Sequence, residues 1–195
     1  MTTYEDFVER ARVVHREDPH GAAERYHETL VSYLRELRES PPEALLLAGW
    51  CQHVRRWSLP RDAYPRTTAG YRRWRSELGR RHAETARELA LEVGYPEEIA
   101  ARAGEIILHK ALARDPDGMT LEDAACLTFL ELEAEGFAEA HARRVGAADA
   151  SEVVAILKKT WGKMSDRGRE VALRCEARGD FPPAVARLLR QALEG

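Results

Sequence analysis

Three histidines, His53, His82 and His109, lie on the apolar faces of three different predicted helices. An apolar helix face points toward the protein core, so we expect the three imidazoles to point inward. Neutral imidazole is the commonest metal ligand, and helical bundles build metal sites from inward-facing ligands on several helices. Each histidine taken alone is explained by burial with a single hydrogen bond. Together, the three predict a site for a divalent metal ion.

Asp123 supplies a carboxylate that could complete this set of ligands. It shares a helix face with Cys126, Leu127 and Leu130, and a carboxylate on an apolar face needs a partner. Asp123 also follows Thr120 by three residues, which resembles the spacing of a capping box at the start of a helix. Two roles for Asp123 therefore stay open, metal ligand and helix cap.

Arginine is concentrated between His53 and His82, where tryptophan and tyrosine are interleaved with it. The guanidinium fork binds phosphate through two hydrogen bonds, and aromatic rings stack on bases or on guanidinium groups. The segment predicts binding of a nucleotide, another phosphorylated metabolite or RNA. The alternative is a solvated basic face that pairs with acidic helices of the same chain. The residues that we predict to bind the substrate are Arg55, Arg56, Arg72, Arg73 and Lys110.

The elements that must position these residues are helices. Apolar residues recur at i, i+3, i+4 and i+7 along most of the chain, and no run alternates as a strand would. Proline and glycine mark the ends, because proline cannot continue a helix and glycine adopts the left-handed conformation that stops one. The predicted helices span about residues 4–14, 22–39, 43–57, 69–94, 96–114, 120–135, 138–145, 151–163, 166–177 and 184–195.

Composition sets the class of protein. Of 195 residues, 44% are hydrophobic and 32% are charged, which is typical of a globular chain rather than a disordered one. The length is sufficient for one domain with a real core, so we predict a single all-α helical bundle over residues 1–195. The net charge of −3 gives no overall attraction to nucleic acid or to a membrane.

Several other classes of protein are disfavoured. No apolar run approaches the ~20 residues of a membrane span, and the first residues do not form a signal-peptide pattern. The three cysteines lie far apart and fit reduced thiols, so we expect a cytoplasmic protein. The chain lacks the common nucleotide-loop, zincin and hydrolase-elbow motifs.

The order of these residues resembles the HD superfamily of metal-dependent phosphohydrolases. In that family a helix ends in a His-Asp doublet, later helices bring further histidines, and a final Asp completes the site. The matching segments are residues 45–54, 82–110 and 121–127, and His27 is a candidate for the family's first histidine. The resemblance implies an HD-like core over about residues 20–135, followed by additional helices over about residues 136–195.

The chain departs from that family at the doublet, where Gln52-His53 or His53-Val54 stands. The Asp of the doublet bridges two metals in binuclear HD sites. The resemblance therefore implies a single metal ion held by His53, His82 and His109, with or without Asp123.

The whole chain is more closely similar to an uncharacterised family of HD-like proteins, known only as a domain of unknown function. The segments that carry this similarity are QHVRRW at 52–57, GYRRWR at 70–75, LEDAACL at 121–127 and TWGKMS at 160–165. This second family brings no known activity.

From these features we expect an HD-like metal-dependent phosphohydrolase that acts on a nucleotide or another small phosphorylated metabolite. The alternative is a catalytically degenerate HD-like module that binds a phosphorylated ligand or RNA through its arginine-rich site.

Overall fold

The computed structural model describes residues 2–108, 114–145 and 150–194 of the chain. These residues form helices and connecting turns with no strand, which confirms the all-α prediction. The helices are α1 (Thr3–His15), α2 (Ala23–Leu37), α3 (Glu43–Cys51), α4 (Thr68–Glu92), α5 (Glu97–Leu108), α6 (Pro116–Thr128), α7 (Ala134–Val145), α8 (Ser151–Lys163), α9 (Asp166–Arg178) and α10 (Pro183–Glu194). Two short 3-10 helices, Arg56–Ser58 and Arg61–Ala63, precede α4, and a π-helical turn, Phe129–Glu133, joins α6 to α7.

The short helix α3 lies at the centre of the core. Its residues from Ala44 to Cys51 are buried except Leu46, as expected for a helix that is apolar on all sides. Helices α1, α2, α4, α5 and α6 all contact it. At Gly49 a Cβ atom would lie 2.5 Å from a methyl group of Leu34, so the missing side chain lets α2 and α3 approach closely.

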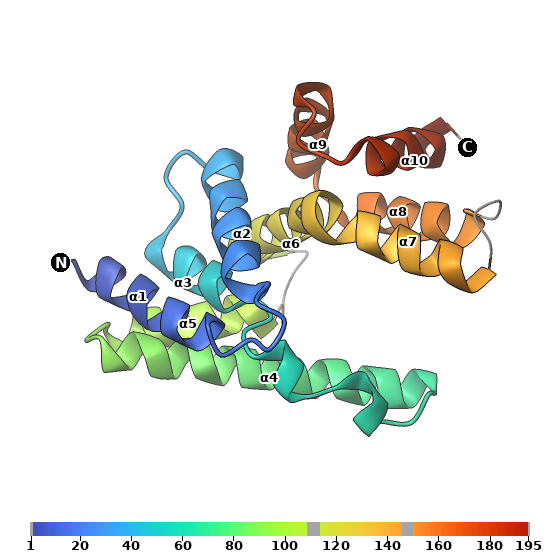
Figure 1. Ribbon diagram of the computed structural model, residues 1–195. Coiled ribbons are helices and arrows are strands. Elements are labelled where there is room, and N and C mark those ends of the chain that lie inside the picture. The colour runs from blue at the N-terminus through green and yellow to red at the C-terminus, as the bar shows by residue number, and fades with distance from the viewer. Residues whose placement is uncertain (1, 109–113, 146–149, 195) are drawn as a thin grey trace.

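The long helix α4 forms a hairpin with α5. Gly94, with φ of +93°, allows the reversal between them. The C-terminal half of α4 packs along α5, while its N-terminal half extends past the core and runs below α7 and α8 (Figure 1). Arg72, Arg73 and Arg75 lie on this half of α4, whereas the other arginines between His53 and Thr68 precede the helix.

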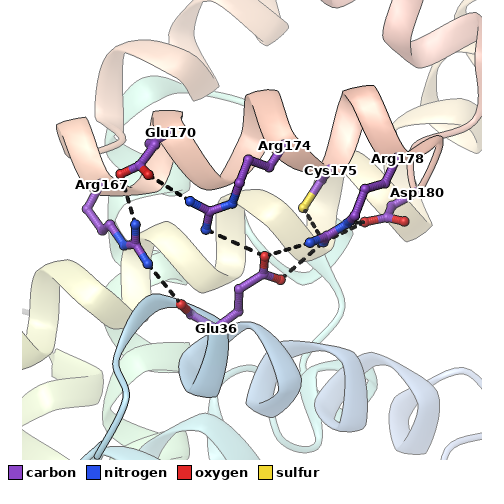
Figure 2. Close-up of polar contacts among 7 residues, drawn as sticks. All are labelled: Glu36, Arg167, Glu170, Arg174, Cys175, Arg178 and Asp180. Atoms are coloured by element: carbon purple, nitrogen blue, oxygen red, sulfur yellow. Dashed lines mark hydrogen bonds and ion pairs between the residues drawn. The ribbon is translucent and has the colours of Figure 1, made fainter.

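The C-terminal helices pack on the rest of the chain. Helix α7 continues the line of α6, α8 lies beside α7, and α9 and α10 cover the end of the molecule that bears the C-terminus (Figure 1). Figure 2 shows the contact of α9 with the end of α2, where the Glu36 carboxylate accepts hydrogen bonds from the Arg178 guanidinium at 2.9 and 3.2 Å. Arg174 pairs with the same carboxylate at 3.6 Å. Among the described helices none is long and apolar enough to cross a membrane.

Several predicted helix boundaries are wrong, and two of them have a clear physical reason. The third predicted helix ends at Cys51 rather than near Trp57, because His53 and Arg55 adopt left-handed conformations with φ of 70° and 51°. The helix predicted to begin at Thr120 begins at Pro116, since Asp115 caps it by accepting a hydrogen bond from the backbone N–H of Asp117.

Candidate functional site

A cavity of about 560 Å³ opens between the N-terminal half of α4 and the helices α6, α7 and α8. This volume is within the range of pockets that bind small molecules. Helix α4 supplies four polar or aromatic side chains to its wall, namely Tyr71, Trp74, Arg75 and His82. The opposite wall carries Glu122, Cys126, Glu133 and Lys163, and the inner end is formed by Tyr26, Gln52, His53 and Arg56.

His53 and His82 come together in this cavity, with ring centroids 5.9 Å apart. His82 lies on α4 and is 3% exposed. His53 follows the end of α3, and its left-handed backbone turns the chain toward the cavity. Such a conformation is costly for a residue with a side chain, and it is found more often at functional sites than elsewhere.

The hydrogen bonds of the two imidazoles differ. The Tyr26 hydroxyl and His53 Nδ1 lie 3.1 Å apart, and the direction of that bond depends on the tautomer. Neither nitrogen of His82 has a hydrogen bond of good geometry with a described residue, although the Val54 backbone is close enough to favour its protonated form slightly. Both nitrogens of His82 are shielded from solvent.

Both imidazoles are neutral near pH 7. Burial lowers the pKa of His82 to about 4. Burial also lowers the pKa of His53 well below its ordinary value, and the positive charge of Arg56 adds to the effect. A neutral ring can accept a proton or bind a metal ion, whereas a protonated ring can do neither.

Two exposed arginines, Arg56 and Arg75, line the cavity beside the imidazoles, and the charge of Arg56 acts on the Glu133 carboxyl group. The guanidinium carbon of Arg56 lies 5.5 Å from the centroid of the Trp74 ring, a cation–π contact. Arg75 lines the same cavity. In the described parts of the chain neither guanidinium has a carboxylate within ion-pair distance, unlike Lys163, which pairs with Glu122 at 3.3 Å. The carboxyl pKa of Glu133 is raised because the cavity walls remove much of its water.

The other predicted substrate-binding residues lie elsewhere. Arg55 faces away from the cavity and donates two hydrogen bonds to Glu17. Arg72 and Arg73 are exposed and do not line the cavity. Lys110 is outside the described residues. Arg75 was missed, although it precedes His82 by seven residues, a spacing that places both on one face of α4.

Asp123 is also outside this cavity. Its carboxylate accepts hydrogen bonds from the backbone N–H of Ser165, at 2.8 Å, and from the Ser165 hydroxyl. Ser165 is in turn the N-cap of α9, where its side chain accepts a hydrogen bond from the backbone N–H of Gly168. A Cβ atom at Gly168 would lie 2.4 Å from Asp123 Oδ1, so glycine is required there. Asp123 therefore anchors the start of α9, and the prediction that it caps its own helix is wrong.

The predicted set of metal ligands is only partly assembled. His53 and His82 meet, Asp123 is held by Ser165, and His109 is outside the described residues. Among the residues that the structure does describe, no group of three His, Cys, Asp or Glu side chains has an arrangement that could hold a metal ion. The described donor set therefore does not by itself fit a metal centre.

Comparison with known proteins identifies the family. A family model described as a domain of unknown function, DUF4202, matches residues 6–185. The chain belongs to the DUF4202 family. No curated protein and no solved structure matches it. The predicted membership of an uncharacterised family is thus confirmed, and it assigns no activity to the cavity.

Two further histidines of this DUF4202 domain, His15 and His27, contact the turn that carries His53. His15 and His27 are buried and stack with ring centroids 3.9 Å apart. Their Nε2 atoms lie 3.0 Å from the Trp50 carbonyl oxygen and 2.7 Å from that of Gln52. These carbonyls belong to the end of α3, where the helix offers no N–H partner. The two rings therefore fix the turn that carries His53.

Proposed function

We propose that this protein binds a small phosphorylated ligand in the cavity between α4 and α6–α8, with Arg56 and Arg75 as its phosphate-binding groups. The observation that carries the proposal is that both guanidiniums line the cavity with no carboxylate within ion-pair distance in the described parts of the chain. By contrast, Arg55, Arg80 and Arg81 pair with Glu17 or Glu77 on the outer surface.

Phosphate is the anion that this arrangement suits. Arginine binds phosphate oxygens through its planar fork, and Arg56 and Arg75 are exposed and thus accessible to a ligand. His82 adds a neutral ring to the wall of the same cavity. A cavity of about 560 Å³ admits a phosphorylated metabolite. The resemblance to HD phosphohydrolases points to the same class of ligand.

Hydrolysis of the bound phosphoester is the second candidate function. It is favoured by the pair of neutral imidazoles beside the two guanidiniums, since neutral imidazoles are metal ligands and proton acceptors. The two described imidazoles alone do not complete a metal site, and His109 would have to supply the third ligand. If a divalent ion binds there, it would supply an activated water and stabilise charge on the phosphate.

Ligand-induced thermal stabilisation tests the proposal. Pyrophosphate and a panel of phosphorylated metabolites should raise the melting temperature of the wild-type protein. Arg56→Gln and Arg75→Gln should each weaken the binding about tenfold or more, because each removes a charge-assisted contact. Arg72→Gln is the matched control, since Arg72 is an exposed arginine of the same helix outside the cavity.

The proposal fails if no phosphorylated compound stabilises the protein, or if Arg72→Gln weakens binding as much as the two cavity variants. Hydrolysis is tested separately by elemental analysis of the purified protein and by assays with phosphomonoester and phosphodiester substrates. Absence of turnover with any metal ion added would leave ligand binding as the function.

A further inference from the structure

A second cavity, of about 700 Å³, lies on the other side of Arg56. It adjoins the loop before α2 and the segment between α3 and α4. Five residues line both cavities, and they come from α2, the turn after α3, α4 and the π-helical turn. These five residues, which we call the neck, are Tyr26, His53, Arg56, Trp74 and Glu133.

The wall of the second cavity beyond the neck is largely apolar. Trp57, Leu59, Pro60 and Leu132 form much of it, and Trp57 is partly buried. Arg61, which also lines this cavity, donates both ends of its guanidinium to the carbonyls of Tyr64 and Pro65. The second cavity thus combines aromatic and aliphatic surface with two further arginines, Arg56 at the neck and the exposed Arg25.

Other polar groups of the second cavity are also engaged. The Asp18 carboxylate accepts hydrogen bonds from the backbone N–H groups of His20, Ala22 and Ala23. Both nitrogens of His27 lie within 2.7 Å of carbonyl oxygens. The Trp74 indole N–H is bonded to the Leu59 carbonyl at 2.9 Å. What these groups leave for a ligand is ring faces and aliphatic surface, together with Arg25 and Arg56.

We infer that the two cavities form one bipartite site, in which the phosphate group lies at Arg56 and Arg75 and a planar aromatic part of the same ligand lies in the second cavity against Trp57. This inference rests on the proposed function, because the phosphate places the ligand at the neck. Aromatic rings are the occupants that such surface favours, since an indole face stacks on any flat ring.

A pair of ligands that differ only in the organic group tests this inference. Methylphosphonate and phenylphosphonate carry the same anionic group, and neither has a P–O–C bond to hydrolyse. Phenylphosphonate should bind wild-type protein about tenfold more tightly or better, as measured by calorimetry. Trp57→Leu should abolish that gain and leave the affinity for methylphosphonate unchanged, because Trp57 lines the second cavity alone.

The matched control is Trp161→Leu, which removes a partly buried tryptophan outside both cavities. It should keep the tenfold gain. Equal binding of the two phosphonates, or a gain that survives Trp57→Leu, overturns the bipartite site while the phosphate site stands. If neither phosphonate binds wild-type protein and pyrophosphate does not either, the proposed function fails together with this inference.

Discussion

Acidification should destabilise this protein steeply, because burial lowers the pKa of His15, His27, His53 and His82. Burial lowers the pKa from the ordinary value of 6.5 to about 3 at His15 and to about 4 at His27 and His82. At His27 the nearby carbonyl oxygens oppose this shift, but burial prevails. In the unfolded chain all four rings would titrate near their ordinary pKa.

The direction of the pH dependence of stability follows from these lowered pKa values. A histidine with a depressed pKa in the folded state contributes its full stability above pH 6.5 and loses it as the pH falls toward the folded pKa. Between those limits the unfolded state binds more protons, and each histidine costs about 1.4 kcal/mol per pH unit. At pH 5 this amounts to about 2 kcal/mol per histidine, or about 6 kcal/mol for His15, His27 and His82 together. Domains of ordinary stability have only about 5–15 kcal/mol in total.

Carboxyl groups modify this dependence only modestly above pH 5. Asp18, Glu36 and Asp115 have lowered pKa values, so their contribution is lost only below their ordinary pKa values near 4. Asp123 and Glu133 have raised pKa values and therefore act in the opposite sense. The interval from pH 7.5 to 5 thus reports mainly on the histidines.

Urea denaturation at several pH values, followed by circular dichroism, measures this dependence. His82→Gln should be less stable at pH 7.5, and its unfolding free energy should fall by about 2 kcal/mol less between pH 7.5 and 5. His20→Gln, at an exposed position, should keep the wild-type slope. A wild-type stability that does not change over this interval, or an unchanged slope in His82→Gln, would refute the reasoning.

Three other predictions concern packing and hydrogen bonding, and all are measured by urea denaturation. Gly168→Ala should lower the free energy of unfolding by about 2 kcal/mol or more, because the added Cβ would meet the Asp123 carboxylate. This loss should largely disappear in an Asp123→Ala background. Equal losses in the two backgrounds would contradict this account. Glu36→Gln should lower the free energy of unfolding by about 1 kcal/mol, because it weakens the hydrogen bonds from Arg178. An unchanged free energy of unfolding would show that this contact does not stabilise the fold. Tyr26→Phe should cost about 1 kcal/mol by removing the hydroxyl bonded to His53, and a variant with wild-type stability would argue against that bond.

The candidate site was partly accessible from the sequence. The apolar faces around His53 and His82 indicated that both rings point inward, and the structure places them in one cavity. Arg56 was predicted from its position in the arginine-rich segment, and it lines the same cavity. Arg75 was recoverable from its seven-residue spacing to His82, but the density of arginines around it concealed that signal.

Asp123 shows where sequence reasoning stops. Its position on an apolar face predicted a partner, and it has one, but that partner is Ser165, 42 residues further along the chain. The helix cap predicted near Thr120 does not account for it. The second cavity was equally inaccessible, because its wall combines residues from segments between Asp18 and Glu133.

The sequence by itself determined that this protein is helical, approximately where most of its helices run, and that it belongs to a family without a known activity. Those conclusions depend on periodicity, proline, glycine and local motifs, which act over a few residues. Only the tertiary structure decided which polar groups meet and which arginines stay unpaired. Whether a buried charge or imidazole has a hydrogen-bond partner depends on atoms that packing brings from distant segments. The spacing of residues within one helix does not determine which distant atoms come near.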